Sequence, residues 1–220
     1  IEVAVVAGFA VARLGVAAPT NAGSYTVTAV LGATTKTGTL VIAKAPLYVT
    51  PDDQRKFAGQ ANPTPLGFTY SGFQGTDTDS VITKAPALKT TATTASAGGL
   101  YPITASGATA LNYSFIYRQG TLVVESFAGT YEALLVDGTA LPAGKVSIVV
   151  TNTSKTFTGK IYAATESTAL PVSGTLTTNG DETATGAFSG TRLTIPYTLS
   201  FTLPLYGDVT VTTTRNGMDI

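Results

Sequence analysis

Two short stretches near the start of the chain, AGSYTVTA at residues 22–29 and GTLVI at residues 38–42, decide how the sequence folds because both recur. AGGLYPITA at residues 97–105 repeats the first with one added residue, and GTLVV at residues 120–124 repeats the second. The aligned residues are Tyr25, Val27, Thr28 and Ala29 in the first stretch, and Tyr101, Ile103, Thr104 and Ala105 in its repeat. Matching segments in the same order indicate two copies of one structural module.

The repeat divides the chain into three predicted domains. Residues 1–45 would form a partial or short module, residues 46–126 a complete one, and residues 127–220 a different C-terminal domain. This last segment lacks the AG-Y and closing GTL order of the two copies and instead gives a threonine-rich series of alternating strands. Such a series is typical of an antiparallel meander.

Strand patterns run through the whole sequence. In Ser24–Val30, Tyr25 and Val27 alternate with threonines, so a pleated strand would place the two kinds of side chain on opposite faces. No long stretch keeps the apolar spacing of a helix. We therefore predict an all-β fold, with tandem small β domains (β-grasp-like or Ig-like modules) followed by a Thr-rich antiparallel β-meander or sandwich. Asn179-Gly180 predicts a hairpin, because a type I′ turn needs positive φ at both central residues.

The composition excludes several classes of chemistry. The 220 residues include no cysteine, histidine or tryptophan, which removes thiolate and imidazole metal sites, disulfides, and Ser-His-Asp or Cys-His catalysis. Thirteen basic residues balance 13 acidic ones, and charged residues make up only 12% of the chain. No excess of Lys and Arg is present for contacts with phosphates, so we expect no nucleic-acid partner.

The apolar opening of the chain raises the question of a membrane span. Glu2 and Arg13 interrupt it, and the uninterrupted run is shorter than the roughly 20 residues that a spanning helix needs. Buried strands are the favoured interpretation, and we expect no membrane span in this segment. The chain begins at Ile1 without an initiator methionine or a basic leader, which indicates an excerpt whose export signal or anchor would lie elsewhere.

The order of motifs in the first 125 residues resembles that of the MBG modules, small mostly-β domains found in tandem in very large bacterial surface and secreted proteins. The first copy matches in PTNAGSYTVTA (19–29) and GTLVIAKA (38–45). The second copy matches in KAPLYVTPDDQRKFAGQANP (44–63), GFTYSGFQGTD (67–77), AGGLYPITASG (97–107) and NYSFIYRQGTLVV (112–124). The C-terminal segment is similar only loosely to β domains that accompany such arrays.

One departure from the family pattern concerns a turn in the second copy. The family usually has a Tyr-Gly pair before its Asn-Pro, whereas here Phe57, Ala58 and Gly59 precede Asn62-Pro63. The resemblance therefore implies a turn at this place that is built differently. It implies no catalytic residue, because the family offers no catalytic motif to match.

Carboxylates are the only strong acid-base groups in the chain, and a glycosidase needs just two of them. The close pairs are Asp52-Asp53, Asp77 with Asp79, and Asp181-Glu182. Each lies in a predicted loop, where Asp side chains commonly cap backbone N–H groups. We therefore predict no enzymatic activity and no catalytic residue.

Calcium is the candidate metal that the sequence suggests. GTDTDS at residues 75–80 offers the alternating oxygens of Asp77 and Asp79, which suit a hard cation. The segment lacks the further acidic ligands of an EF-hand loop, so turn capping is the competing interpretation. Asp77 and Asp79 are the candidate calcium ligands, and no other cofactor is predicted.

These features favour a structural stalk or fibre segment of an extracellular or cell-surface bacterial protein. Its partners would be neighbouring modules of the same or identical chains, and the half-length first copy with weakly charged strand edges suits strand sharing between subunits. The alternative is a carbohydrate-binding or adhesive module that uses tyrosines in loops such as Leu66–Phe73 and the turn near Tyr206, with glycans as partners.

Overall fold

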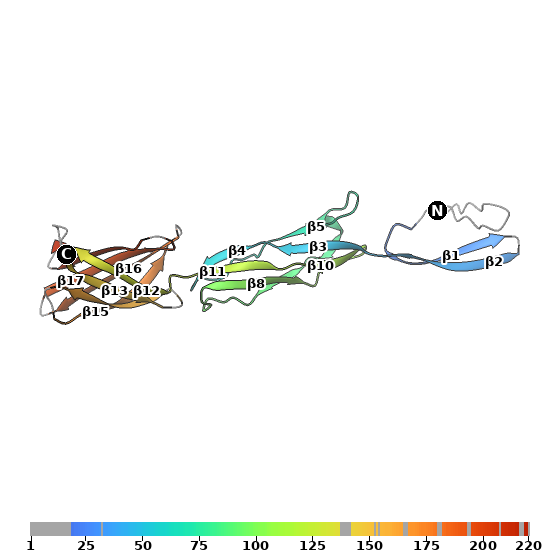
Figure 1. Ribbon diagram of the computed structural model, residues 1–220. Helices are drawn as coiled ribbons and strands as arrows, with labels where there is room; N and C mark the ends of the chain where they lie inside the picture. Colours follow the sequence, from blue (N-terminus) through green and yellow to red (C-terminus); the bar gives the residue numbers. More distant parts are fainter. Residues whose placement is uncertain are drawn as a thin grey trace. The chain divides into compact units, whose positions relative to one another are not determined.

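The computed structural model describes residues 19–31, 33–136, 142–151, 153, 155–164, 167–179, 182–192, 195–206, 208–215 and 218–219. Within these ranges the chain forms β-strands and a single short 3₁₀ helix, η1 (Asp79–Val81), which confirms the predicted all-β class (Figure 1). None of the described segments is a helix of the length and apolarity required to cross a bilayer. The opening stretch of residues 1–18 lies outside the described residues.

The chain divides into two compact units. The first comprises Ile1–Pro51, Gly67–Lys89 and Thr104–Gln119, and the second comprises Asp52–Leu66, Thr90–Ile103 and Gly120–Ile220. Both units contain parts of the second repeat copy, because the boundaries between the units fall within it, after Pro51, Leu66, Lys89, Ile103 and Gln119. Each unit is described in turn.

The described residues of the first unit form three small sheets. Their strands are β1 (Gly23–Leu31), β2 (Thr34–Ile42), β3 (Ala45–Pro51), β5 (Phe68–Ser71), β6 (Ile82–Lys84), β9 (Thr109–Ala110) and β10 (Tyr113–Tyr117). β1 pairs with β2, β3 lies between β10 and β5, and β6 pairs with β9. Leu47, Ala110 and Tyr113 form its buried core, with the rings of Tyr70 and Phe73 packed against them.

The second unit begins with a sheet that the second repeat copy builds. β11 (Gly120–Glu125) lies between β4 (Gln54–Phe57) and β8 (Gly99–Ser106), and β7 (Ala87–Thr90) follows β8 in the order. β11 runs parallel to β4 and antiparallel to β8. Its buried positions alternate regularly, with Leu122 and Val124 facing the interior.

The predicted repeat is present in the strand register. In the first copy Tyr25 pairs with Leu40 and Val27 with Gly38. In the second copy Tyr101 pairs with Leu122 and Ile103 with Gly120, which are the corresponding residues. The two copies therefore form the same antiparallel pair of strands in the same register.

The rest of the second unit is an eight-stranded antiparallel meander. Its strands follow one another in sequence order: β12 (Gly129–Val136), β13 (Pro142–Val150), β14 (Thr156–Ala163), β15 (Leu170–Thr178), β16 (Thr183–Arg192), β17 (Ile195–Pro204), β18 (Thr210–Arg215) and β19 (Met218–Asp219). β12 also contacts β18, so the sheet curls around an apolar interior, as the yellow-to-red part of Figure 1 shows.

Alternation explains the meander's core. Phe157 and Ile161 of β14 are buried while the residues between them face outward. The ring of Phe157 meets that of Phe201 edge to face, with centroids 4.8 Å apart. Threonines occupy many of the outward positions, so the threonine-rich pattern forms the solvent face of the sheet.

The predicted hairpin at Asn179-Gly180 joins β15 to β16. The register pairs Thr178 with Ala184, and the Asn179 N–H donates to the Thr183 carbonyl at 2.7 Å. The connection is therefore longer than the two residues of a type I′ turn, while Gly180 and Asp181 themselves lie outside the described residues.

Candidate functional site

Opposite faces of β4 and β11 have different roles in the second unit. Val124 pairs with Lys56 and Glu125 with Phe57. Since successive side chains of a strand point to opposite faces, Lys56 shares a face with Leu122 and Val124, whereas Arg55, Phe57 and Glu125 share the other. This second face meets the C-terminal meander, and we call the contact region the joint.

An aromatic stack forms the apolar part of the joint. The rings of Phe57 and Phe127 lie nearly parallel, with centroids 5.5 Å apart. Phe127 is only 1% exposed and belongs to the core of the meander, and Phe57 packs against that core. A side chain of the second repeat copy is thereby part of the packing of the C-terminal sheet.

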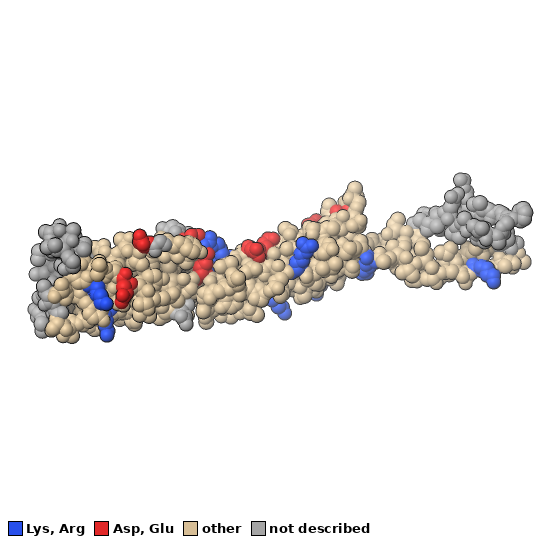
Figure 2. Space-filling model, in the orientation of Figure 1, with Lys and Arg blue, Asp and Glu red and all other residues tan. Residues whose placement is uncertain are grey.

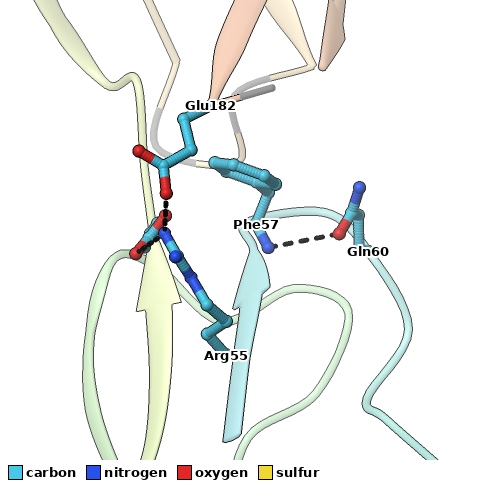
Figure 3. Close-up of polar contacts among 5 residues, drawn as sticks. Arg55, Phe57, Gln60 and Glu182 are labelled. Carbon is cyan, nitrogen blue, oxygen red and sulfur yellow. Dashed lines mark hydrogen bonds and ion pairs between the residues drawn. The ribbon is translucent and has the colours of Figure 1, made fainter. Parts of the chain in front are cut away.

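An ion-pair cluster forms the polar part (Figure 3). The Arg55 guanidinium Nη2 lies 2.5 Å from Glu125 Oε1 and 2.8 Å from Glu182 Oε1. Hydrogen bonds to Glu125 and then to Glu182 raise the pKa of Arg55, so the group stays fully charged. Arg55 thus links its neighbouring strand to the β15–β16 connection.

Glu182 is held in an unusual backbone conformation. Its φ of 63° lies in the left-handed region, which is unfavourable for a residue with a Cβ. The Leu205 N–H donates to the Glu182 carbonyl at 2.8 Å. This bond and the ion pair with Arg55 hold Glu182 where it meets β4.

The turn after β4 makes the closest approach. Gly59 has φ of 84°, and a Cβ at this position would lie 2.6 Å from Lys155 Cε and 2.9 Å from the Thr153 carbonyl oxygen. The Gln60 side chain accepts the Phe57 N–H at 3.2 Å and donates to Thr178 Oγ1 at 3.4 Å (Figure 3). Glycine is therefore required here both for its conformation and for the space.

A shallow groove of about 560 Å³ lies beside this turn. It is lined by residues 58–60 and by parts of the β14 and β15 region, including Lys155, Leu176 and Thr178. The groove has no acidic residue among those that line it. It is the space left between the turn and the meander.

Lys56 fixes the turn from the other face of β4. It is 5% exposed, and its ammonium donates to the carbonyls of Gln60 at 3.0 Å and Thr93 at 2.7 Å. Burial lowers the pKa of Lys56. Asn62 Nδ2 donates to the Ala92 carbonyl at 2.7 Å, so two side chains tie the turn region to the segment around residue 92.

The comparisons with known proteins identify the segment that carries this turn. Residues 47–123 match the family model described as "MBG domain (YGX type)". This segment is an MBG domain. No curated protein and no solved structure matches the chain. The predicted resemblance is confirmed for the second repeat copy; the first copy and the C-terminal meander lie outside the matched residues.

MBG domains are mostly-β modules of surface proteins, and the family is not known to be enzymatic. The joint lies at one end of the MBG domain, where Phe57, Ala58 and Gly59 replace the usual Tyr-Gly pair. This departure is visible in the sequence, but nothing in the sequence connects it with the meander. It is the one sequence feature that marks the place of the joint.

The predicted calcium ligands lie at a loop of the MBG domain. Asp77 Oδ2 accepts a hydrogen bond of 2.6 Å from the Tyr113 hydroxyl, which itself accepts the Gln74 N–H at 2.8 Å. Asp79 begins η1, whose cap is Thr78. In the described part of the chain no group of three or more acidic side chains gathers as a metal cluster would. Calcium binding by Asp77 and Asp79 stays a prediction.

The other carboxylate pairs have separate surroundings. Asp53 Oδ1 accepts the Thr121 N–H at 2.7 Å, which ties the start of β4 to β11. Glu182 belongs to the ion-pair cluster, and its predicted neighbour Asp181 lies outside the described residues.

A third copy of the tyrosine motif begins the meander. Ala128-Gly129-Thr130-Tyr131 repeats the AG-Y pattern, so the prediction that the C-terminal segment lacks this pattern was wrong. Each motif tyrosine donates to the carbonyl four residues earlier: Tyr25 to Asn21, Tyr101 to Ala97 and Tyr131 to Phe127. In the meander this bond holds Phe127, the residue on which Phe57 stacks.

Proposed function

We propose that this chain is a structural stalk segment of an extracellular, cell-surface protein, in which the joint keeps the MBG domain and the meander in a fixed orientation. The observation that carries the proposal is that the joint combines three kinds of contact: the Phe57–Phe127 stack, the Arg55 ion pairs and the close approach of Gly59.

The connection along the chain also favours a stiff joint. Only residues 126–128 separate β11 from β12. The Ala128 N–H donates to the Ser126 hydroxyl at 3.0 Å, and Tyr131 donates to the Phe127 carbonyl at 2.8 Å. A short connection with internal hydrogen bonds behaves differently from a flexible Gly/Ser linker, which would leave neighbouring domains free to reorient.

The surface is compatible with this role. On the face drawn in Figure 2, basic and acidic side chains are scattered over a surface made mostly of other residues. A stalk needs durable packing rather than a charged binding surface, and the threonine faces of the meander provide neutral hydroxyl groups.

Distances between two spin labels test the proposal. The chain has no cysteine, so cysteines at Leu100 and Leu134, which are 74% and 77% exposed, can be labelled selectively. We expect a narrow distance distribution in the parent. It should broaden in Phe57→Ala and in Arg55→Ala, which remove the stack and the ion pairs.

Arg118→Ala provides the matched control. Arg118 lies over the Tyr48 ring, 4.7 Å from its centroid, and both residues belong to the first unit. Its removal should leave the distribution unchanged. A broad distribution in the parent, or one that Phe57→Ala does not affect, would contradict a fixed joint.

Glycan binding is the second candidate, favoured by Tyr206, which is 80% exposed. The predicted loop Leu66–Phe73 contains the strand β5 instead, and there Tyr70 packs edge to face on Phe73, and Phe73 on Tyr113. Those rings pack with one another and offer no flat platform. Retention on insoluble polysaccharides that Tyr206→Ala abolishes would support the glycan candidate over the stalk.

A further inference from the structure

The repeated AG-Y motif lies beside the exit of each repeat copy. The strand that the motif begins pairs antiparallel with the last strand of the copy, so the start of one strand lies next to the end of the other. Gly23 at the start of β1 pairs with Ile42 at the end of β2, and Gly99 at the start of β8 pairs with Val124 near the end of β11. In both copies the motif therefore adjoins the residues that lead into the following module.

The motif tyrosine shapes this part of the chain. Tyr25 and Tyr101 each donate from the hydroxyl to the carbonyl four residues earlier, at 2.9 and 3.0 Å. This bond closes a turn that we call the AG turn, which comprises residues 21–25 in the first copy and 97–101 in the second. The backbone N–H groups of the turn still need hydrogen-bond partners of their own.

Asn112 of the MBG domain contacts the AG turn of the first copy. Its Oδ1 accepts the Ala22 N–H at 2.8 Å, and its Nδ2 donates to Asn21 Oδ1 at 3.1 Å. Its carbonyl accepts the Ala45 N–H at 2.8 Å. All four residues belong to the same compact unit. One asparagine, placed between β9 and β10, thus holds both the AG turn and the first residue of β3.

The short connection between the first copy and the MBG domain is held at the same place. Residues 43–44 alone separate β2 from β3. The ammonium of Lys44 donates to the Ala110 carbonyl at 2.9 Å, and Ala110 ends the strand that precedes Asn112. A two-residue connection with this bond differs from a flexible linker, which would let the two modules reorient.

The AG turn of the second copy lies against the connection to the meander. A Cβ on Gly98 would lie 2.7 Å from Ser126 Cβ, which is too close for two carbon atoms that are not bonded to each other. Ser126 is the first residue after β11. Glycine is therefore required in this turn because the connection to the next module approaches it closely.

We propose that the AG turn is the element by which each repeat copy is held to the module that follows it, and that Asn112 is the residue with which the MBG domain binds the AG turn of the first copy. An asparagine suits this role, because its side chain offers an acceptor and a donor in one planar group. The proposal goes beyond the joint, since it assigns a second fixed connection to the chain and a function to the repeated motif.

Distances between spin labels at Val30 and Ile116 test the role of Asn112. These residues lie on β1 and β10 and are 59% and 43% exposed. With cysteines at these two positions only, we expect a narrow distance distribution in the full chain. Asn112→Ala should broaden it, because the change removes both side-chain hydrogen bonds and leaves the carbonyl that accepts the Ala45 N–H.

Two further variants separate the contact from a general loss of stability. Asn21→Ala changes an exposed residue, removes the bond to Asn112 Nδ2 alone, and should broaden the distribution less than Asn112→Ala. Ser24→Ala is the matched control, because Ser24 is an exposed residue of the same turn that takes no part in these bonds. It should leave the distribution unchanged. A broad distribution in the parent, or one that neither asparagine variant affects, would overturn the proposal.

The hydrogen exchange rate of the Ala22 amide provides an independent measurement. We expect slow exchange in the parent, and exchange roughly fivefold to tenfold faster in Asn112→Ala, as the loss of one hydrogen bond of average strength predicts. Asn112→Asp retains an oxygen acceptor and should keep the exchange slow. The amides of β3 should be unaffected in both variants, which shows that the MBG domain stays folded.

Equal exchange of the Ala22 amide in the parent and in Asn112→Ala would mean that Asn112 does not bind the turn, and would contradict the proposal. The labels at Leu100 and Leu134 report on the joint and not on Asn112. A failure of the proposed function would therefore be recognised separately.

Discussion

The two hairpin pairs, β1–β2 and β8–β11, show how much of a β module is set locally. Both place a tyrosine opposite a leucine in the same register, and both tyrosines donate to the carbonyl four residues earlier. Their burial differs nonetheless: β11 alternates between buried and half-buried residues, while most of β2 is exposed. Register therefore follows from the pair itself, and burial follows from the neighbours.

The neighbours of β11 explain the difference. β4 covers one edge, and Lys56 on β4 reaches across to the carbonyls of Gln60 and Thr93. The first copy has no described counterpart of β4. The same local sequence thus forms the centre of a sheet in the second copy, and a two-stranded sheet among the described residues of the first.

The largest expected effect comes from truncating the matching leucines. Leu122→Ala should lower the free energy of unfolding by about 2–5 kcal/mol, because the residue is fully buried and leaves a cavity. Leu40→Ala should cost less than about 1.5 kcal/mol, because the half-buried side chain loses little packing. Urea unfolding measures the loss of stability in both variants. Native-state amide exchange of β2 and β11 shows which strand pair is affected. Equal losses would show that β2 is covered as completely as β11.

Alanine substitutions at two glycines should change the stability of the chain in opposite directions, which sharpens the comparison. Gly59→Ala should destabilise the chain by roughly 1–3 kcal/mol, because a Cβ there strains a positive φ and meets the Thr153 carbonyl. Gly38→Ala in β2 meets no atom within 4 Å and should stabilise by about 0.5 kcal/mol through the unfolded chain. Thermal unfolding followed by circular dichroism measures each change. A neutral Gly59→Ala would contradict close packing at the joint.

Much of the fold could be predicted because its causes are local. Alternating residues such as Tyr25 and Val27 fix the strand faces, and the repeated motifs fix the register of two strand pairs. The meander followed from the regular threonine spacing. The AG-Y motif at Tyr131 shows that the same local pattern also begins a strand of the meander.

The joint could not be predicted because its residues meet through packing across long sequence separations. Arg55 and Glu182 are far apart in the sequence, and nothing in either neighbourhood indicates the other. The length of the β15–β16 connection could not be predicted from the sequence either. Asn-Gly predicts a two-residue turn, but here the connection extends to Glu182, which the joint holds at positive φ.

Replacing the motif tyrosines by phenylalanine should lower the free energy of unfolding by smaller amounts, which depend on how buried each hydrogen bond is. Replacing Tyr131 by Phe removes a partly buried bond to Phe127 and should cost about 1 kcal/mol. The same change at Tyr25 removes an exposed bond and should cost about 0.5 kcal/mol or less. Urea unfolding of the two single variants provides the measurement. A larger loss at Tyr25 would indicate that the first copy depends on this bond more than its exposure suggests.

The smallest effect concerns Tyr113, whose strand β10 has no described counterpart in the first copy. Burial, followed by the hydrogen bond to Asp77, raises the pKa of Tyr113 above its ordinary value of 10. The unfolded chain therefore loses this proton first as the pH rises. Stability from the protonated hydroxyl is complete below pH 10 and declines as the pH rises through the folded pKa.

In Tyr113→Phe the decline in stability above pH 10 should be shallower than in the parent. Tyr70 and Tyr131 still contribute to the decline, because burial also raises their pKa values. Urea midpoints at pH 8–11 measure the two slopes. Parallel slopes would contradict a pKa of Tyr113 that burial and the Asp77 hydrogen bond raise.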